Sequence, residues 1–170
     1  MQKTSLPMTT DEELVKRTIS GGSHHFGVLV ERYSDYLFGL GMRLTYGNKD
    51  MSEDISQQAF LKSYAYLKSF DNKKSFKHWL TRIAINSFKD LITKENQYSS
   101  SESAMEPSHT PELEGDQDFF NIIRPLSEDE KTIFILRFIY EYQVNEIGEL
   151  LTMKSGTVKS KLSRAMEKLR

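Results

Sequence analysis

The last fifteen residues, 156–170, combine side chains whose chemistry suits contact with nucleic acid. An arginine can grip guanine O6 and N7 with two hydrogen bonds, lysine suits phosphate, and hydroxyls donate or accept. At helical spacing, one face opposite Val158 and Leu162 carries Thr157, Ser160, Lys161 and Arg164, with Lys159 and Ser163 at its margins. This face could enter a major groove; the alternative is a solvated basic surface.

A second group of polar residues lies in the first half of the chain. Ser75 can cap a helix on which Arg82, Asn86 and Lys89 recur opposite an apolar stripe. Asp90 could accept a hydrogen bond from a cytosine amine or pair with a lysine. The segment Asp71–Lys74 breaks the preceding helix, and Asp71 and Asn72 could form a simple turn.

The apolar pattern predicts the helices that carry the C-terminal cations. Two short apolar faces flank a turn at 152–155; they consist of Val144, Ile147, Leu150 and Leu151, then Val158, Leu162, Ala165 and Leu169. Two short helices joined by a tight turn, the second rich in cations, indicate a helix-turn-helix. A capping-box pattern at Ser127–Glu130 predicts the start of the helix before it.

Four further helices are expected between Thr10 and Thr93. Thr10 with Glu13, Asp50 with Glu53, and Ser75 provide predicted N-caps. One long helix carries its apolar residues on a single face: Phe26, Leu29, Val30, Tyr33, Leu37, Leu40 and Leu44. We expect no strands.

Charge divides the chain into basic, acidic and basic parts, although the net charge is only −1. Residues 73–94 and 154–170 are each strongly basic, whereas 95–120 contains acids and no lysine or arginine. Residues 98–111 are polar, contain two prolines and lack an apolar period. The expected fold is all-α: two small helical domains at 8–97 and 121–170, joined by a flexible acidic linker at 98–120.

The composition bounds the class of protein. With 38% hydrophobic and 28% charged residues, the chain is typical of a soluble globular protein, and no apolar run is long enough to span a membrane. Cysteine is absent, and the four histidines are scattered apart from His24–His25, so we expect no metal site and no cofactor. No nucleophile-and-base arrangement or phosphate-binding glycine loop indicates an enzyme. A cytoplasmic protein is expected.

Several segments resemble a known family. Residues 156–170 (GTVKSKLSRAMEKLR) closely resemble the last recognition helix of the extracytoplasmic-function (ECF) subfamily of sigma-70 RNA polymerase sigma factors. Residues 126–130 and 144–151 resemble the rest of that family's region 4, and 53–60 (EDISQQAF) and 76–86 (FKHWLTRIAIN) resemble parts of its region 2. Departures occur at Gln143, Thr152 and Lys154, where the family usually has serine, glycine and proline.

The resemblance implies roles for individual residues. It assigns reading of the promoter −35 element to Lys159, Ser160, Ser163 and Arg164, with Thr157 beside them and Lys161 on phosphate. It assigns the −10 element and strand opening to the loop Phe70, Asp71, Asn72, Lys73, Lys74 and Ser75, and to the helix positions Arg82, Asn86, Lys89 and Asp90. Polymerase binding is assigned to Asp54, Gln57, Gln58 and Phe60, although Phe60 could be core and the others simply solvated.

The function implied is an alternative sigma factor that binds core RNA polymerase, through the β′ clamp helices and the β flap, and directs promoter-specific transcription initiation. Promoter DNA and an anti-sigma factor are the other expected partners, with no membrane insertion. A dimeric helix-turn-helix regulator acting without core polymerase is the main alternative. A protein-interaction bundle that does not bind DNA is a second one.

Overall fold

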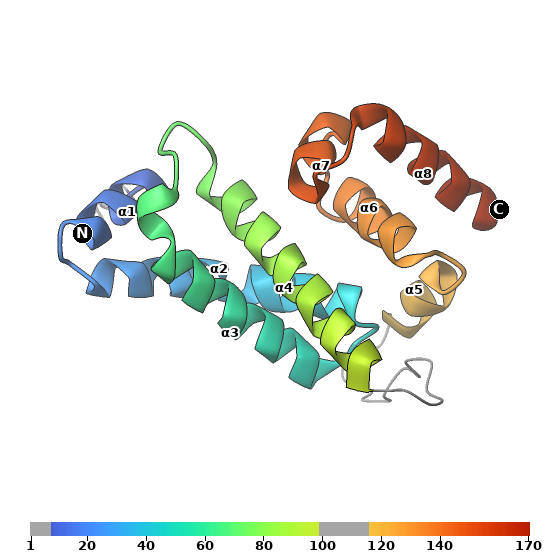
Figure 1. The fold of residues 1–170 in the computed structure, drawn as a ribbon, viewed down its shortest axis with the longest axis horizontal. Coiled ribbons are helices and arrows are strands. Elements are labelled where there is room, and N and C mark those ends of the chain that lie inside the picture. The colour runs from blue at the N-terminus through green and yellow to red at the C-terminus, as the bar shows by residue number, and fades with distance from the viewer. Residues whose placement is uncertain (1–7, 99–115) are drawn as a thin grey trace, which may run out of the picture.

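Nine helical segments follow one another in the part of the chain that the structure describes. The computed structural model describes residues 8–98 and 116–170. The segments are α1 (Asp11–Ile19), α2 (His24–Leu44), α3 (Lys49–Ala65), the short 3-10 helix η1 (Leu67–Ser69), α4 (Phe76–Tyr98), α5 (Asp116–Ile123), α6 (Glu128–Phe138), α7 (Val144–Leu151) and α8 (Ser155–Lys168) (Figure 1). No strand occurs in these two ranges, so the all-α prediction is confirmed.

Short polar side chains start the helices. Thr10 Oγ1 accepts from the backbone N–H of Glu13 at 3.2 Å, and Ser75 Oγ accepts from that of His78 at 3.3 Å. Ser127 and Glu130 form the predicted capping box of α6. The prediction for α3 was wrong in position: Asn48, not Asp50, is the N-cap, with Oδ1 accepting from Met51 at 3.1 Å. These bonds satisfy backbone donors that the first helical turn leaves unpaired.

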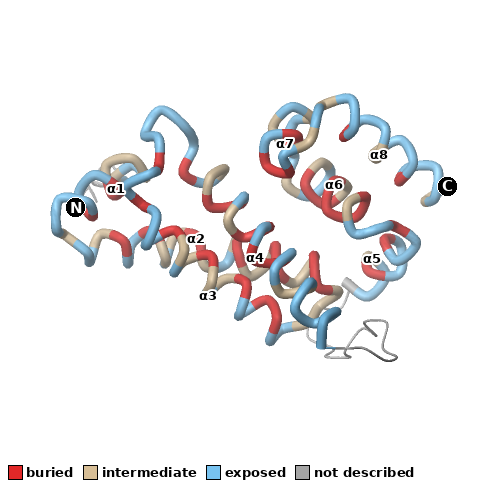
Figure 2. Tube along the Cα trace, viewed as in Figure 1, coloured by how far each residue is buried: buried red, intermediate tan, exposed pale blue. Residues whose placement is uncertain are grey.

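The first module, α1 to α4, buries the apolar stripes that the sequence predicted. Leu29, Leu37 and Leu40 of α2 are fully buried against α3 and α4, and α1 is tied to α2 by an ion pair between Asp11 and Arg32 at 2.6 Å. Figure 2 shows buried residues along the inner sides of these helices and exposed residues on the outer sides. The module therefore presents one face each of α3 and α4 to solvent.

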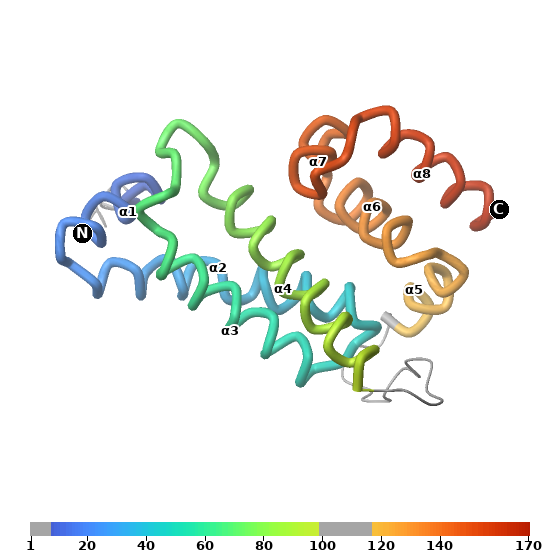
Figure 3. The backbone as a smooth tube through the Cα atoms, viewed as in Figure 1, coloured from blue at the N-terminus to red at the C-terminus, as the bar shows by residue number. Residues whose placement is uncertain are grey.

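The second module, α5 to α8, folds back on itself. α6 packs against both α7 and α8, and the trace in Figure 3 shows the sharp turn between α7 and α8. Its own core cluster contains Ile133, Leu136, Ile147 and Val158. These positions match the predicted helix-turn-helix.

Both ends of the predicted linker belong to helices. Tyr98 is the last residue of α4, and residues 116–120 belong to α5 instead of a flexible segment. Phe120 is buried and contacts the first module, with its ring 6.2 Å from that of Tyr46. The middle of the predicted linker, 99–115, lies outside the described residues.

The two modules pack directly against each other, which the sequence did not predict. α4 contacts α7 and α2 contacts α6 (Figure 1). Thr81 and Ile85 of α4 are fully buried, and Ile85 belongs to the core cluster of the second module. Within the described ranges, no helix is long and apolar enough to cross a membrane.

Candidate nucleic-acid and polymerase interfaces

The turn before α8 sets the direction of that helix. Thr152 ends α7 in the left-handed conformation, with φ of +55°. Ser155 Oγ, at the start of α8, donates to Asn145 Oδ1 of α7 at 2.9 Å. The turn therefore forms without glycine, at the cost of placing a β-branched residue in a region it disfavours.

Helix α8 exposes most of the residues assigned to the −35 element. They are Thr157, Lys159, Ser160, Ser163 and Arg164, while Val158 and Ala165 are buried beneath them. Ser160 Oγ donates to the carbonyl of Gly156 at 3.0 Å, which leaves its lone pairs open to a donor. Within the described residues, Lys159 and Arg164 form no ion pair.

Lys161 was placed wrongly by helical spacing. It lies at the edge of the packed side of α8, half-buried, and its Nζ pairs with Asp129 of α6 at 3.0 Å. Lys159 and Ser163, expected at the margins, are both exposed. The reason is that α6 packs against α8 and its Asp129 reaches Lys161, a contact that the pattern of a single helix does not reveal.

The loop before α4 forms a lined cavity. Lys74 donates its backbone N–H to the carbonyl of Asp71 at 2.9 Å, so the segment is indeed a tight turn. A cavity of about 430 Å³ lies beside it. Glu149 and Leu150 of α7 close one side of the cavity. The rest of the lining comes from the first module and combines cationic, aromatic and hydroxyl side chains with one carboxylate: Ser69, Phe70, Asp71, Lys74, Ser75, His78, Trp79 and Arg82. Asn72 and Lys73 are exposed at the tip.

Phe70 differs from the other residues assigned to the loop. It is only 7% exposed, and its ring packs 5.5 Å from that of Phe76 and 5.2 Å from that of Trp79. The apolar ring is therefore the last core residue before the turn. Phe70 forms a wall of the cavity.

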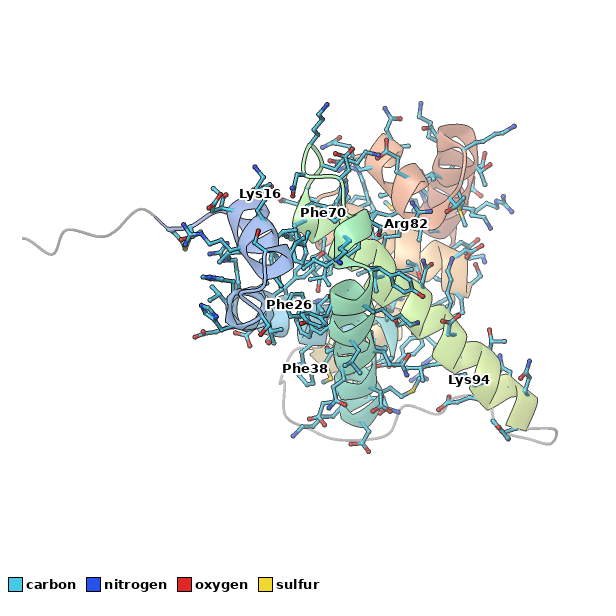
Figure 4. All side chains as sticks on the ribbon, turned by 60° about the vertical axis from the view of Figure 1, so that its left-hand side comes forward. Lys16, Phe26, Phe38, Phe70, Arg82 and Lys94 are labelled. Carbon is cyan, nitrogen blue, oxygen red and sulfur yellow. The ribbon has the colours of Figure 1, made fainter. Side chains whose placement is uncertain are left out.

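The remaining residues assigned to the −10 element lie on α4 and are exposed, but they differ in their hydrogen-bond and ion-pair partners. Arg82 points toward the second module, where its Nη2 donates to Thr152 Oγ1 at 3.3 Å (Figure 4). Asn86 and Lys89 are exposed on the helix. Asp90 pairs with Lys62 of α3 at 3.1 Å, which is the ion-pair alternative the sequence left open.

Helix α3 has one solvent-facing stripe. Asp54 and Gln57 are exposed on it, Gln58 is half-buried, and Phe60 is half-buried against the first-module core. Leu61, which was not predicted, is 72% exposed one turn beyond Gln57. The signal that could have found it is the i, i+3, i+7 spacing from Asp54 through Gln57 to Leu61, which ends in a leucine on the polar side.

These surfaces can bind a polyanion and a protein, and they offer little else chemically. The described residues contain no group of three or more potential metal ligands. Arg164 and Lys159 on α8, and Lys74 and Arg82 at the cavity, are cations at two separate places. That arrangement suits two contacts with one nucleic acid.

Sequence comparison identifies both modules. The Sigma-70 region 2 family matches residues 29–98, and the Sigma-70 region 4 family matches residues 117–169. The ECF RNA polymerase sigma factor SigW of Bacillus subtilis is 33% identical, with 92% of each chain covered. The chain belongs to the ECF sigma factors.

Other relatives agree with this assignment. The ECF RNA polymerase sigma-E factor of Haemophilus influenzae is 31% identical to this sigma factor, covering 93% of this chain and 92% of the relative. Among solved structures, the sigma factor RpoE of Bartonella quintana, in complex with the anti-sigma factor NepR, is 28% identical with a TM-score of 0.68. The match covers 85% of this chain and 93% of the other, so it extends over both modules.

The first module has a solved counterpart bound to DNA. An engineered region 2 of sigma-E, in complex with GTAAAA, is 32% identical with a TM-score of 0.51 and covers 56% of this sigma factor and 99% of the solved chain.

Proposed function

We propose that this sigma factor binds core RNA polymerase through the exposed stripe of α3 and brings two DNA-reading surfaces to a promoter. The observation that carries the proposal is the presence, in one chain, of an exposed cationic recognition helix and a separate cationic loop and helix in the region 2 module. A helix-turn-helix regulator that acts without polymerase would use only the recognition helix. The cationic loop and helix of the region 2 module, and the exposed stripe of α3, would then have no role.

At the −35 element, α8 is proposed to lie in the major groove. Arg164 would read guanine, Ser160 and Ser163 would accept or donate at neighbouring base edges, and Lys159 would bind phosphate. Thr157, at the N-terminal end of α8, lies where recognition helices approach the groove. Lys161 can reach phosphate only by leaving Asp129.

At the −10 element, the loop and α4 are proposed to hold opened DNA. Unstacking a base costs about a few kcal/mol, which a protein pocket offsets by binding the extruded base. The cavity walled by Phe70 and Trp79 offers stacking surfaces, and Lys74 and Arg82 offer cations for phosphate. Asn86 would read an adjacent base edge, and Lys89 would bind the backbone.

The polymerase surface is proposed to be Asp54, Gln57, Gln58 and Leu61, docking on the β′ clamp helices. Phe60, half-buried, supports this stripe from beneath. The second module would contact the β flap. Catalysis then belongs to the polymerase, the sigma factor is not an enzyme and needs no cofactor, and it acts in the cytoplasm where the polymerase works. An anti-sigma factor is a further proposed partner, because a 28% identical relative was solved with one.

Binding to purified core polymerase tests the α3 surface. Asp54→Ala and Leu61→Ala should each weaken the affinity about tenfold, or about 1.4 kcal/mol. Lys68→Ala, at an exposed residue of η1 outside the stripe, is the control and should bind as the unaltered chain does. Equal affinities for all four proteins would contradict the assignment.

A further inference from the structure

One exposed tyrosine takes no part in the packing of the fold. Tyr66, the C-cap residue of α3, is 65% exposed, and in the described part of the chain its side chain has no hydrogen bond and no ring contact. Most other tyrosines pack against a second aromatic ring, namely Tyr33, Tyr36, Tyr46, Tyr64, Tyr140 and Tyr142. Single exposed apolar residues are common on protein surfaces, so the surroundings of Tyr66 decide whether it binds anything.

The backbone holds Tyr66 at the rim of the cavity beside the loop 70–75. Its carbonyl accepts two hydrogen bonds from Ser69, one from the backbone N–H at 2.9 Å and one from Oγ at 2.6 Å. Ser69 itself lines the cavity. Leu67, between these two residues, is 3% exposed and belongs to the first-module core, so the backbone that presents the ring is anchored. A ring on an anchored backbone has little conformational freedom to lose when it binds a ligand.

Helical geometry places Tyr66 on the side of α3 that faces α4. Its backbone N–H still bonds to the carbonyl of Lys62 at 2.9 Å, so the two side chains lie one turn apart on the same side of α3. Lys62 Nζ reaches Asp90 and Ser87 of α4, at 3.1 and 3.3 Å. The end of α3 lies next to the start of α4 (Figure 1), so Tyr66 is one turn nearer to that start than Lys62. Asn86, proposed to read a base edge, directly precedes Ser87 on this stretch of α4.

Tyr66 does not continue the proposed polymerase stripe of α3. That stripe runs from Asp54 through Gln57 to Leu61, and Tyr66 follows Leu61 by five residues. On a helix this separation turns the side chain away by about 140°. Tyr66 therefore points to a different partner from the one proposed for the stripe.

The charge around Tyr66 favours a polyanion. Residues 62–77 contain five lysines and a single acid, Asp71. An exposed aromatic ring among cations suits single-stranded nucleic acid, because the bases stack on the ring while the cations attract the phosphates. Both requirements are met at the rim of the cavity.

We propose that Tyr66 stacks on an unpaired base of the opened −10 element, at the rim of the cavity walled by Phe70 and Trp79. The inference rests on the function proposed above and adds a base contact outside that cavity. The opened strand then has stacking surfaces for two bases, one in the cavity and one on Tyr66. Because tyrosine stacks on any base, the contact strengthens the hold on opened DNA more than it selects the sequence.

Binding of the holoenzyme to fork-junction DNA tests this contact. The probe is a promoter fragment selected by run-off transcription, with a duplex −35 part and a single-stranded −10 part. Tyr66→Ala and Tyr66→Leu should each weaken binding about tenfold, or about 1.4 kcal/mol, because both remove the ring. Tyr66→Phe should bind as the unaltered chain does. Tyr98→Ala, at an exposed tyrosine beyond the proposed DNA contacts of α4, is the control and should also bind unchanged.

Removal of single bases identifies the stacking partner. Abasic sites are placed at successive positions of the single strand, and each strand is bound by the unaltered chain and by Tyr66→Ala. At one position the abasic site should abolish most of the tenfold effect of Tyr66→Ala, because the base and the ring form one contact. At the other positions the effect should persist.

The outcomes separate the stacking contact from the function on which it rests. An effect of Tyr66→Ala that is absent, or equal at every abasic position, would overturn the stacking contact, as would a Tyr66→Leu chain that binds as well as Tyr66→Phe. Weaker binding of Tyr66→Ala to core polymerase without DNA would also overturn it, since Tyr66 would then be a polymerase contact. If the unaltered chain with core polymerase yielded no promoter in the selection, the proposed function would be contradicted instead.

Discussion

Arg164 and Lys161 lie one turn apart on α8 but have different surroundings. Arg164 is exposed with no ion pair in the described part of the chain, whereas Lys161 is held by Asp129. A bidentate contact from arginine to guanine discriminates by about 1–3 kcal/mol. Arg164→Ala should therefore lose about that much affinity for the preferred −35 sequence and little for altered ones, measured by competition between promoter variants for the holoenzyme.

The lysines of α8 should differ in their effect on salt dependence. Each phosphate contact adds about 0.9 to the slope of log K against log salt. Lys159→Ala should lower the magnitude of the slope by about 0.9, the value for one phosphate contact. Lys161→Ala should lower it by less, because Asp129 already neutralises that ammonium. The slope is measured by titrating holoenzyme on a −35 fragment between low and moderate salt. A larger loss for Lys161→Ala than for Lys159→Ala would reject the exposed-face assignment.

Thr152 bears local backbone strain. A left-handed conformation costs a residue with a side chain about 1–2 kcal/mol, and glycine avoids this at an entropic cost of about 0.5–1 kcal/mol. Thr152→Gly should thus stabilise the fold by about 0.5–1 kcal/mol, seen as a higher midpoint in thermal unfolding. Thr157→Gly, the same exchange in the right-handed helix α8, should lower the midpoint.

Among the helices, α6 and α8 are joined by a titratable contact. Glu130 is buried, and its carboxylate accepts from Lys168 Nζ at 2.7 Å and from the backbone N–H of Ser127 at 2.9 Å. The hydrogen bond from Lys168, and then the one from Ser127, lower the pKa of Glu130 below its ordinary value of 4.5.

Because this pKa is lower in the folded chain, the stabilisation is complete above about pH 4.5 and is lost as the pH falls further. Glu130→Gln should remove that part of the acid dependence, measured as the unfolding free energy from pH 3 to pH 6. Glu167→Gln, at an exposed glutamate of α8, should retain it. An unchanged acid dependence in Glu130→Gln would show that other carboxylates cause it.

Helix positions and caps were largely predictable because they depend on local patterns. Ser75 and Ser127 sit where short polar side chains precede apolar periods, and both cap as expected. Spacing within one helix also identified the buried stripes, but it could not say what covers the other sides. For that reason Lys161 was placed on the exposed face, and Ile85 was not recognised as a core residue. Each is covered by a helix from elsewhere in the chain.

Two apolar residues of the first module show how packing between elements decides burial. Phe70 is buried because its ring packs against those of Phe76 and Trp79, which follow it after the turn. Leu61 shows the opposite case, an apolar residue exposed because α2 and α4 both pack on the other side of α3. Tertiary packing, not propensity, decides both.

At the scale of the whole molecule, two basic stretches, 73–94 and 154–170, on either side of an acidic segment gave the order of the domains but not their contact. That contact depends on a few side chains far apart in sequence, such as Lys131 with Leu44 and Tyr142 with Tyr36. None of these has a local signal. The packing of the two modules is therefore seen only in the structure.

Run-off transcription with purified core polymerase on a library of DNA fragments tests the central claim most directly. Addition of the chain should create new, discrete start sites preceded by shared −10 and −35 sequences, and Arg164→Ala should weaken those that depend on the −35 bases. If the folded chain bound the same fragments without polymerase yet produced no new start sites with it, the assignment as a promoter-directing sigma factor would be contradicted.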